Sequence, residues 1–333
     1  LLDRLDAKEN KQVILKKDDN GNLVYLVIID RDVAQSEYAH DIAIIDDTAM
    51  TNKYGYPLEV IIVVDQEGHT QLLGYAFMPN KTSESFEIFF DVYKSLGYPP
   101  FRIVIADRCF AQYEALEKVF GNDCFVAFCH VHLLRDLQKN FPAADQVIIK
   151  FLFTKLCPER SEEYLQYLKD RYTNSEGPDS HRRAIKILID TYEHWAPKSL
   201  IEHGLYLSFD SSRVEGFFGL FKANYGHERG NIISVINSMN NFGSLLKVQS
   251  YTIVESIRKD FSNFPIIKKD DVSKCGALML TLLGKELDRL SCPTDPSFCV
   301  WCCLRNVNSP LTLPCCHTIR DDTIIDLKDI HSR

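Results

Sequence analysis

The alternation of apolar and polar positions is clearest between residues 42 and 65, where two apolar runs flank a polar turn. The first run, Ile42–Ile45, leads directly into Asp46, and the second spans Leu58–Val64. Short, β-branched apolar runs bounded by turn residues predict buried β-strands. A carboxylate at the tip of such a strand is costly unless it binds a partner, because burial disfavours its charge. Since open α/β sheets bind ligands outside the carboxyl ends of their strands, Asp46 is a candidate site residue.

Further strands are predicted on both sides of this pair. Residues 1–20 are charged and only weakly periodic, which predicts a fraying lead-in, whereas Leu23–Ile29 follows a turn signal and predicts a strand. A short polar connection joins that strand to Ile42. After a hairpin turn at Gln66–His69, Gln71–Phe77 predicts a returning strand.

Helices then alternate with strands. Apolar residues recur at helical spacing from Phe86 to Leu96, and a second helical pattern spans Ala111–Phe120. Between them, Phe101–Ala106 predicts a buried strand that runs into Asp107. A last strand at Cys124–Cys129 is followed by a helix near Val131–Gln138.

This order predicts an α/β fold in which a meander of three strands is followed by helix, strand, helix and strand. Asp46 and Asp107 stand at the tips of the first and fourth strands, and the strand at Leu23–Ile29 lies outside this count. The order and the two carboxylates match the ribonuclease H-like scaffold, whose mixed sheet presents acidic residues at one end. The alternative is any other α/β domain with aspartates at two strand ends.

Beyond Phe141 the pattern becomes helical, which predicts an α-helical insertion. Ser211 and Ser212 then predict the start of a helix whose first turn carries Glu215. Taken alone, such a glutamate could simply complement the helix dipole. One or two amphipathic helices are predicted within 231–260, and a linker and a helix at Ala277–Leu290 follow.

Composition is that of a soluble globular protein, with 45% hydrophobic and 25% charged residues among 333. That length predicts about two domains. No apolar run approaches the ~18 residues of a membrane helix, and no leader argues for secretion. Because the chain starts at Leu1, we expect it to be a fragment. The net charge of −8 gives no global nucleic-acid footprint. Lys and Arg exceed Asp and Glu by eight to four within 211–269, a modest bias that ordinary solvated surface also explains.

Six of the eleven cysteines crowd into the last part of the chain beside His317. In a chain without a leader, such clustering predicts metal ligands before disulfides. The pairs Cys299/Cys302 and Cys315/His317 are suited to tetrahedral Zn²⁺, and Cys303 or Cys316 could substitute. Cys129 and His132 could also bind zinc, but two ligands do not complete a site, and a buried thiol beside a hydrogen-bonded histidine is an equal alternative.

Five segments, which include the strand ends and helices described above, resemble a known family. In chain order they are DDNGNLVYLVIID, IIDDTAMTNKYGYPL, IVIADRCFAQYEALEKVFGN, CFVAFCHVHLLRDL and SSRVEGFFGLFK. From about Asp19 to His317 the chain resembles the Mutator-like element (MULE) transposases, which include domesticated transcription factors of the plant far-red-response type. The matching positions are Asp46, Thr48, Thr51, Asn52, Asp107, Arg108, Cys129, His132 and Glu215, with Arg213 and Lys222 beside the last. The tail LPCCHTI after CVWC resembles the SWIM-type zinc segment that often ends these proteins.

The resemblance implies a DDE-type DNA transposase with catalytic residues Asp46, Asp107 and Glu215. Asp46 is followed by Asp47, but the Asp-x-Thr register and strand alternation favour Asp46. Two Mg²⁺ or Mn²⁺ ions ~4 Å apart would support nicking by water and then strand transfer by the freed 3′-hydroxyl. In this hypothesis Asp46 lies between the ions, Asp107 holds one and Glu215 the other.

The expected partners are transposon ends and target DNA, with Arg213, Lys222 and Arg229 as candidate phosphate contacts. The resemblance also implies a homo-oligomer, a nuclear location, no membrane, and a DNA-binding module upstream of these residues. Two alternatives stay open. One is a domesticated regulator that binds DNA without cutting it. The other, a ribonuclease H-like nuclease unrelated to transposition, leaves the SSRVEG and LPCCHTI segments unexplained.

These patterns together predict five regions along the chain. They are a lead-in and strand at 1–40, the first part of the catalytic core at 41–140, the helical insertion at 141–205, the glutamate-bearing and following helices at 206–262, and the linker, helix and zinc segment at 263–333.

Overall fold

The computed structural model describes residues 10–48, 51–65, 68–153, 159–173, 179–205, 212–225 and 230–261. The predicted linker, the helix at Ala277–Leu290 and the zinc segment lie outside the described residues, as does Arg229. By internal contacts the chain divides into two units, residues 1–63 with 70–244, and residues 64–69 with 245–333. The first unit contains the candidate active site.

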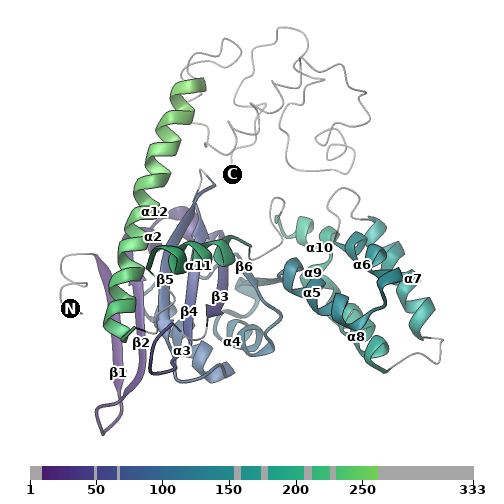
Figure 1. Cartoon of the computed structure of the whole chain (residues 1–333), viewed down its shortest axis with the longest axis horizontal. Helices are drawn as coiled ribbons and strands as arrows, with labels where there is room; N and C mark the ends of the chain where they lie inside the picture. The colour runs from purple at the N-terminus through teal and green to yellow at the C-terminus, as the bar shows by residue number, and fades with distance from the viewer. Residues whose placement is uncertain are drawn as a thin grey trace. The chain divides into compact units, whose positions relative to one another are not determined.

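A seven-stranded mixed sheet forms the centre of the first unit, which confirms the predicted α/β class (Figure 1). The strand order is β1-β2-β5-β4-β3-β6-β7. β3 pairs antiparallel with β4 and parallel with β6, and β6 pairs parallel with β7. The strands are β1 (Lys11–Lys17), β2 (Leu23–Asp30), β3 (Ile42–Thr48), β4 (Leu58–Val64), β5 (Thr70–Phe77), β6 (Ile103–Ala106) and β7 (Phe125–Phe128).

The prediction of a fraying lead-in is wrong for Lys11–Lys17, which forms β1 and pairs antiparallel with β2. β1 is the outer strand, so its lysines reach solvent and obscure the two-residue period that identifies a half-buried strand. Lys11 is an exception, because its ammonium is buried against the carboxylate of Asp30. The connection expected to be polar contains the short helices α2 (Arg31–Ala34) and η1 (Glu37–His40).

Helices cover both faces of the sheet. On one face, α3 (Ser83–Ser95) and α4 (Phe110–Phe120) form a continuous core with the strands, which includes Ile45, Ile61, Phe90 and Leu116. On the other face lie α11 (Ser212–Tyr225) and the first part of α12 (Ile232–Phe261), a single helix where one or two were predicted (Figure 1). The hydroxyl of Tyr75 in β5 donates to Asn240 in α12 at 3.0 Å, which fixes that helix on the sheet.

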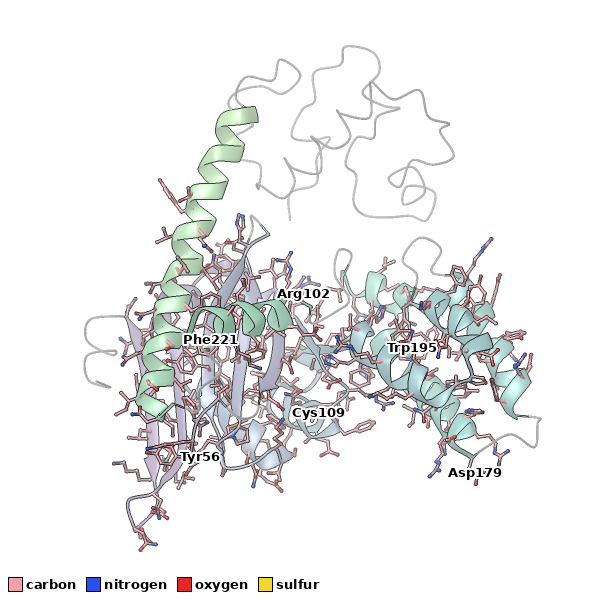
Figure 2. All side chains as sticks on the ribbon, viewed as in Figure 1. Tyr56, Arg102, Cys109, Asp179, Trp195 and Phe221 are labelled. Carbon is pink, nitrogen blue, oxygen red and sulfur yellow. The ribbon has the colours of Figure 1, made fainter. Side chains whose placement is uncertain are left out.

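From the start of α5 at His130 to Glu202 the described residues form helices joined by short turns, and none of them forms a strand, as predicted for the insertion at 141–205. The helices are α5 (His130–Asn140), η3 (Ala143–Asp145), α6 (Gln146–Leu152), α7 (Glu159–Thr173), α8 (Asp179–Asp190), α9 (Tyr192–Trp195) and α10 (Pro197–Glu202), and η2 (Gly121–Asp123) precedes β7. Trp195 is fully buried among them, and its indole N–H donates to the Leu188 carbonyl at 2.8 Å (Figure 2). No described helix combines the length and apolarity that crossing a bilayer requires.

The insertion is fastened to the edge of the sheet at β7. The His194 ring nitrogen Nδ1 donates to the carbonyl of Val126 at 2.7 Å, and the ring packs against Phe128 with centroids 5.1 Å apart. An edge strand exposes backbone groups that would otherwise pair with another chain, so α9 also protects this edge.

Replacing His194 by alanine should therefore loosen the insertion. We expect His194→Ala to lower the free energy of unfolding by about 1–3 kcal/mol, because a buried carbonyl loses its donor. Urea denaturation measures this, with Glu202→Ala on the exposed surface of α10 as the control. Equal stability of the two variants would show that the contact contributes nothing.

Candidate active site

The register of β3 and β6 brings two predicted carboxylates to one place. Ile42 pairs with Ile103 and Ile44 with Ile105, so the same register continued by two residues sets Asp46 opposite Asp107. Residues paired in this way project from the same face of the sheet. Asp46 and Asp107 therefore lie together at the carboxyl end of the two central parallel strands, as the sequence predicted.

Strand alternation also separates Asp46 from Asp47. Asp46 shares its face with Ile44, on the side that α11 covers, whereas Asp47 shares the α3 and α4 side with Ile45. Asp47 contacts the ammonium of Lys81 there. Of the two neighbours, Asp46 is thus the one that faces the glutamate-bearing helix.

Glu215 reaches the same end of the sheet from the first turn of α11. The helix is held by buried apolar residues, among them Val214, Phe217 and Phe221, the last of which is labelled on α11 in Figure 2. His132 joins this glutamate to the strands. Its Nε2 lies 3.4 Å from Glu215 Oε1, and its Nδ1 lies 3.9 Å from Asp107 Oδ1.

Arg135 is a further member of the site that the sequence analysis did not identify. Its two terminal guanidinium nitrogens each lie 3.4 Å from a different carboxylate oxygen of Glu215. The available signal was spacing, since Arg135 follows His132 by three residues in α5 and such residues share one side of a helix.

Charge is crowded at this end of the sheet. Burial is the main cause that raises the pKa of Asp46 to about 6, and the nearby charges of Asp47 and Asp107 add to it. The Asp47 amide, which donates to Asp46 Oδ1 at 2.8 Å, and His132 act in the opposite direction. A hydrogen bond with Cys129, followed by the charges of Asp107 and Asp46, raises the pKa of His132 to about 9.

Residues 42–136 match the family model of the MULE transposase domain. The chain carries a MULE transposase domain. The matched segment begins at the first residue of β3 and ends in α5, so it includes Asp46, Asp107, His132 and Arg135, while Glu215 lies beyond it. No match to a curated protein was found.

The Cys-x-x-His motif of the MULE domain joins the strand end to the carboxylates. Cys129 is buried directly after β7, and its amide donates to the Ala106 carbonyl at 2.8 Å. His132 turns toward Asp107 and Glu215. Among the described residues, no group of three or more His, Cys, Asp and Glu side chains stands in a geometry that could hold a metal ion. A zinc site at Cys129 and His132 therefore gains no support.

The Thr-Asn motif of the MULE domain has a structural explanation. Asn52 is buried, its amide nitrogen donates to the Tyr56 carbonyl at 2.7 Å, and its oxygen accepts from the amides of Tyr54 and Tyr56 at 3.2 and 3.1 Å. The Lys53 amide donates to the Gly230 carbonyl at 3.0 Å, just before α12. Asn52 thus shapes the loop after Asp46 and holds it against the segment that joins α11 to α12.

Glu59 is a second group that the sequence analysis missed, although a glutamate within the apolar run LEVIIVV is itself a signal. It lies opposite Asp47 in the β3–β4 pairing and is fully buried. Gln112 donates to its Oε1 at 2.9 Å, and burial followed by the charges of Asp47 and Asp46 raises its pKa well above the usual range.

Two of the three predicted DNA contacts lie on the same helix as Glu215, and the third lies outside the described residues. Arg213 and Lys222 lie on α11 with Glu215, and the Lys222 ammonium is 6.0 Å from the ring centroid of Phe218. Arg229 and the predicted zinc ligands Cys299, Cys302, Cys315 and His317 lie outside the described residues.

Asn52→Asp should destabilise the MULE domain. The substitution removes the donor to the Tyr56 carbonyl and sets a carboxylate against it, so we expect a loss of about 1–3 kcal/mol in unfolding free energy. Thermal or urea denaturation measures it. Lys53→Gln, on the exposed side of the same loop, is the control and should leave stability within about 0.5 kcal/mol of the wild type.

The raised pKa of Asp46 predicts a pH-dependent stability. The pKa of Asp46 is about 6 in the folded protein, whereas the ordinary pKa of an aspartate is 3.8. Its contribution to stability is therefore greatest below the lower pKa and is lost as the pH rises through the higher one. Asp46→Asn lacks this titration. We expect it to exceed the wild type by about 2 kcal/mol at neutral pH, and the difference to shrink steadily toward acidic pH.

Urea denaturation across that pH range, without added divalent cations, measures the difference. Asp91→Asn is the control, since it removes an exposed carboxylate from α3. A constant offset between Asp46→Asn and the wild type at every pH would contradict the assignment.

Proposed function

We propose that the MULE domain is a DDE-type transposase that nicks transposon ends and transfers the freed strands to target DNA. Asp46, Asp107 and Glu215 are its catalytic carboxylates. The observation that carries the proposal is the β3–β6 register, which sets Asp46 opposite Asp107 on the face where α11 presents Glu215.

The strand order also supports a ribonuclease H-like core. Strands β5, β4 and β3 form the antiparallel meander, and β6 and β7 continue it in parallel. In that scaffold the acidic residues stand at one end of the mixed sheet, which is the arrangement expected here. β1 and β2 extend the sheet beyond β5 at the far side from Asp107.

The carboxylates fit divalent metal ions by donor chemistry and charge. Mg²⁺ and Mn²⁺ prefer hard oxygen ligands, and a half-buried Asp46 with a raised pKa beside other carboxylates is stabilised by an added cation. Two such ions, when bound, would stabilise the attacking and leaving oxygens at phosphorus. Asp46 and Asp107 would hold them, together with Glu215 after it turns from His132 and Arg135.

The protein side chains have distinct parts in this chemistry. At neutral pH His132, with its raised pKa, carries both ring protons and is positively charged. Its attraction to Asp107 and Glu215 orients the two carboxylates. The buried base of the site, formed by β3, β6 and α11, limits the water around Asp46 and so strengthens each electrostatic contact. Arg213, Lys222 and Arg229 are the proposed contacts to DNA phosphates.

One observation favours the second candidate, a domesticated regulator that binds DNA without cleaving it. Glu215 is held by two internal cationic side chains, and the described residues contain no group already arranged as metal ligands. A regulator could keep such charge-compensated carboxylates indefinitely. A transposase has to rearrange them on metal binding, which makes metal binding the deciding property.

Cleavage and strand transfer by four variants test the proposal. Asp46→Asn, Asp107→Asn and Glu215→Gln should each lower both rates by roughly 100-fold or more, because each removes charge stabilisation from the transition state. Asp47→Asn is the matched control, an adjacent carboxylate on the opposite face that should keep activity. Mn²⁺ calorimetry on the same proteins, with zinc sites filled, should show binding lost in Asp46→Asn and Asp107→Asn.

An inactive wild type that binds no Mn²⁺ and still binds DNA would contradict the enzyme and leave the regulator. Activity that survives in Asp46→Asn would contradict the site.

Separately, we propose that Cys299, Cys302, Cys315 and His317 hold a structural Zn²⁺, that the protein acts as a homo-oligomer, and that it works in the nucleus. Elemental analysis and light scattering test the first two, and microscopy of a tagged chain tests the third.

A further inference from the structure

Arg135 stands on the accessible side of the acidic site. The Arg135 side chain is 54% exposed and that of Glu215 31%, so the pair lies where the site meets solvent. Its neighbour Asp136 in α5 already pairs with two other cations, with Arg108 from the loop after β6 at 3.3 Å and with Lys139 of α5 at 3.5 Å. Arg135 thus joins His132 as a second cation of this helix that contacts a proposed catalytic carboxylate, and it is the more exposed of the two.

The ion pair between Arg135 and Glu215 is weak enough for each side chain to change its partner. Ion pairs at exposed positions contribute about 0–1 kcal/mol, and contacts of 3.4 Å are longer than a tight charge-assisted hydrogen bond. A divalent cation offers Glu215 a stronger partner, and a phosphodiester offers a guanidinium a planar, bidentate one. Both groups of the pair therefore gain when metal and DNA arrive together.

We propose that Arg135 is a positioning residue that exchanges partners during the reaction. In the metal-free protein it holds Glu215 at the edge of the site. With Glu215 turned from Arg135 to serve as a metal ligand, the guanidinium would be released to bind a phosphate of the DNA strand beside the scissile bond. The exchange couples metal binding to DNA binding. This inference rests on the proposed function, since it needs Glu215 to bind metal.

A purely structural pair predicts something different. If Arg135 only held α5 to α11, its removal would loosen Glu215 and weaken metal and DNA binding alike. Under partner exchange, removal eliminates a competitor for Glu215, so metal binds more tightly, while DNA loses a phosphate contact. The two affinities move in opposite directions.

The experiment compares Arg135→Gln with Lys139→Gln, a neighbouring exposed cation on the same helix that pairs with Asp136. Mn²⁺ calorimetry without DNA, with zinc sites filled, should show Arg135→Gln binding about threefold to tenfold more tightly than the wild type. Fluorescence anisotropy in Mn²⁺ with a labelled DNA duplex of arbitrary sequence should show that Arg135→Gln binds DNA more weakly than the wild type does. The cleavage-inactive Asp107→Asn variant serves only as a reference. The salt slope should fall by about one phosphate contact. Arg135→Lys should restore part of the DNA affinity, and Lys139→Gln should leave Mn²⁺ affinity unchanged.

Weaker Mn²⁺ binding by Arg135→Gln, or unchanged Mn²⁺ and DNA binding, would overturn the exchange while the wild type still binds metal. Tighter Mn²⁺ binding in Lys139→Gln as well would assign the effect to net charge and overturn it too. If the wild type itself binds no Mn²⁺, the proposed function fails together with the exchange, which distinguishes that failure from a failure of the Arg135 assignment alone.

Discussion

The parallel pairing of β3 with β6 is the contact on which the rest of the structure depends. Both strands are buried, so their register is set by apolar side chains on two covered faces, and a slip of one residue would turn every one of them to the wrong side. The register that packs Ile44 and Ile105 beneath α11 is the same register that sets Asp46 opposite Asp107. Core packing therefore fixes the carboxylate geometry without any contact between the carboxylates.

Helix α5 brings countercharge to this place, and α11 brings a third carboxylate. Both helices lie at the carboxyl end of the central strands. The positive side chains of His132 and Arg135 come from α5, and the carboxylate of Glu215 comes from α11. The apolar residues of α11 supply the stability, which leaves its first turn available for chemistry. Charges on the sheet edge are thus held apart from the core that supports them.

Much of this arrangement follows from sequence. Strand runs that end in Asp46 and Asp107, and a capped helix that carries Glu215, are local patterns, and their convergence follows from an alternating α/β order. Three features that depend on contacts between distant parts of the chain were not predicted. β1 pairs through an outer strand whose lysines conceal its period, Glu59 is buried by tertiary contacts, and Arg135 becomes a site residue only because α11 returns beside α5 after the insertion.

The insertion has one consequence for how the protein is made. Asp46, Asp107, His132 and Arg135 emerge from the ribosome well before Glu215, and the helices made between them pack onto β7, where His194 meets the Val126 carbonyl. A nascent chain that has completed only the sheet carries two of the three carboxylates. Under the proposed function, the site of three carboxylates would therefore be complete only at a late stage of synthesis, once α11 has been made and has packed on the sheet.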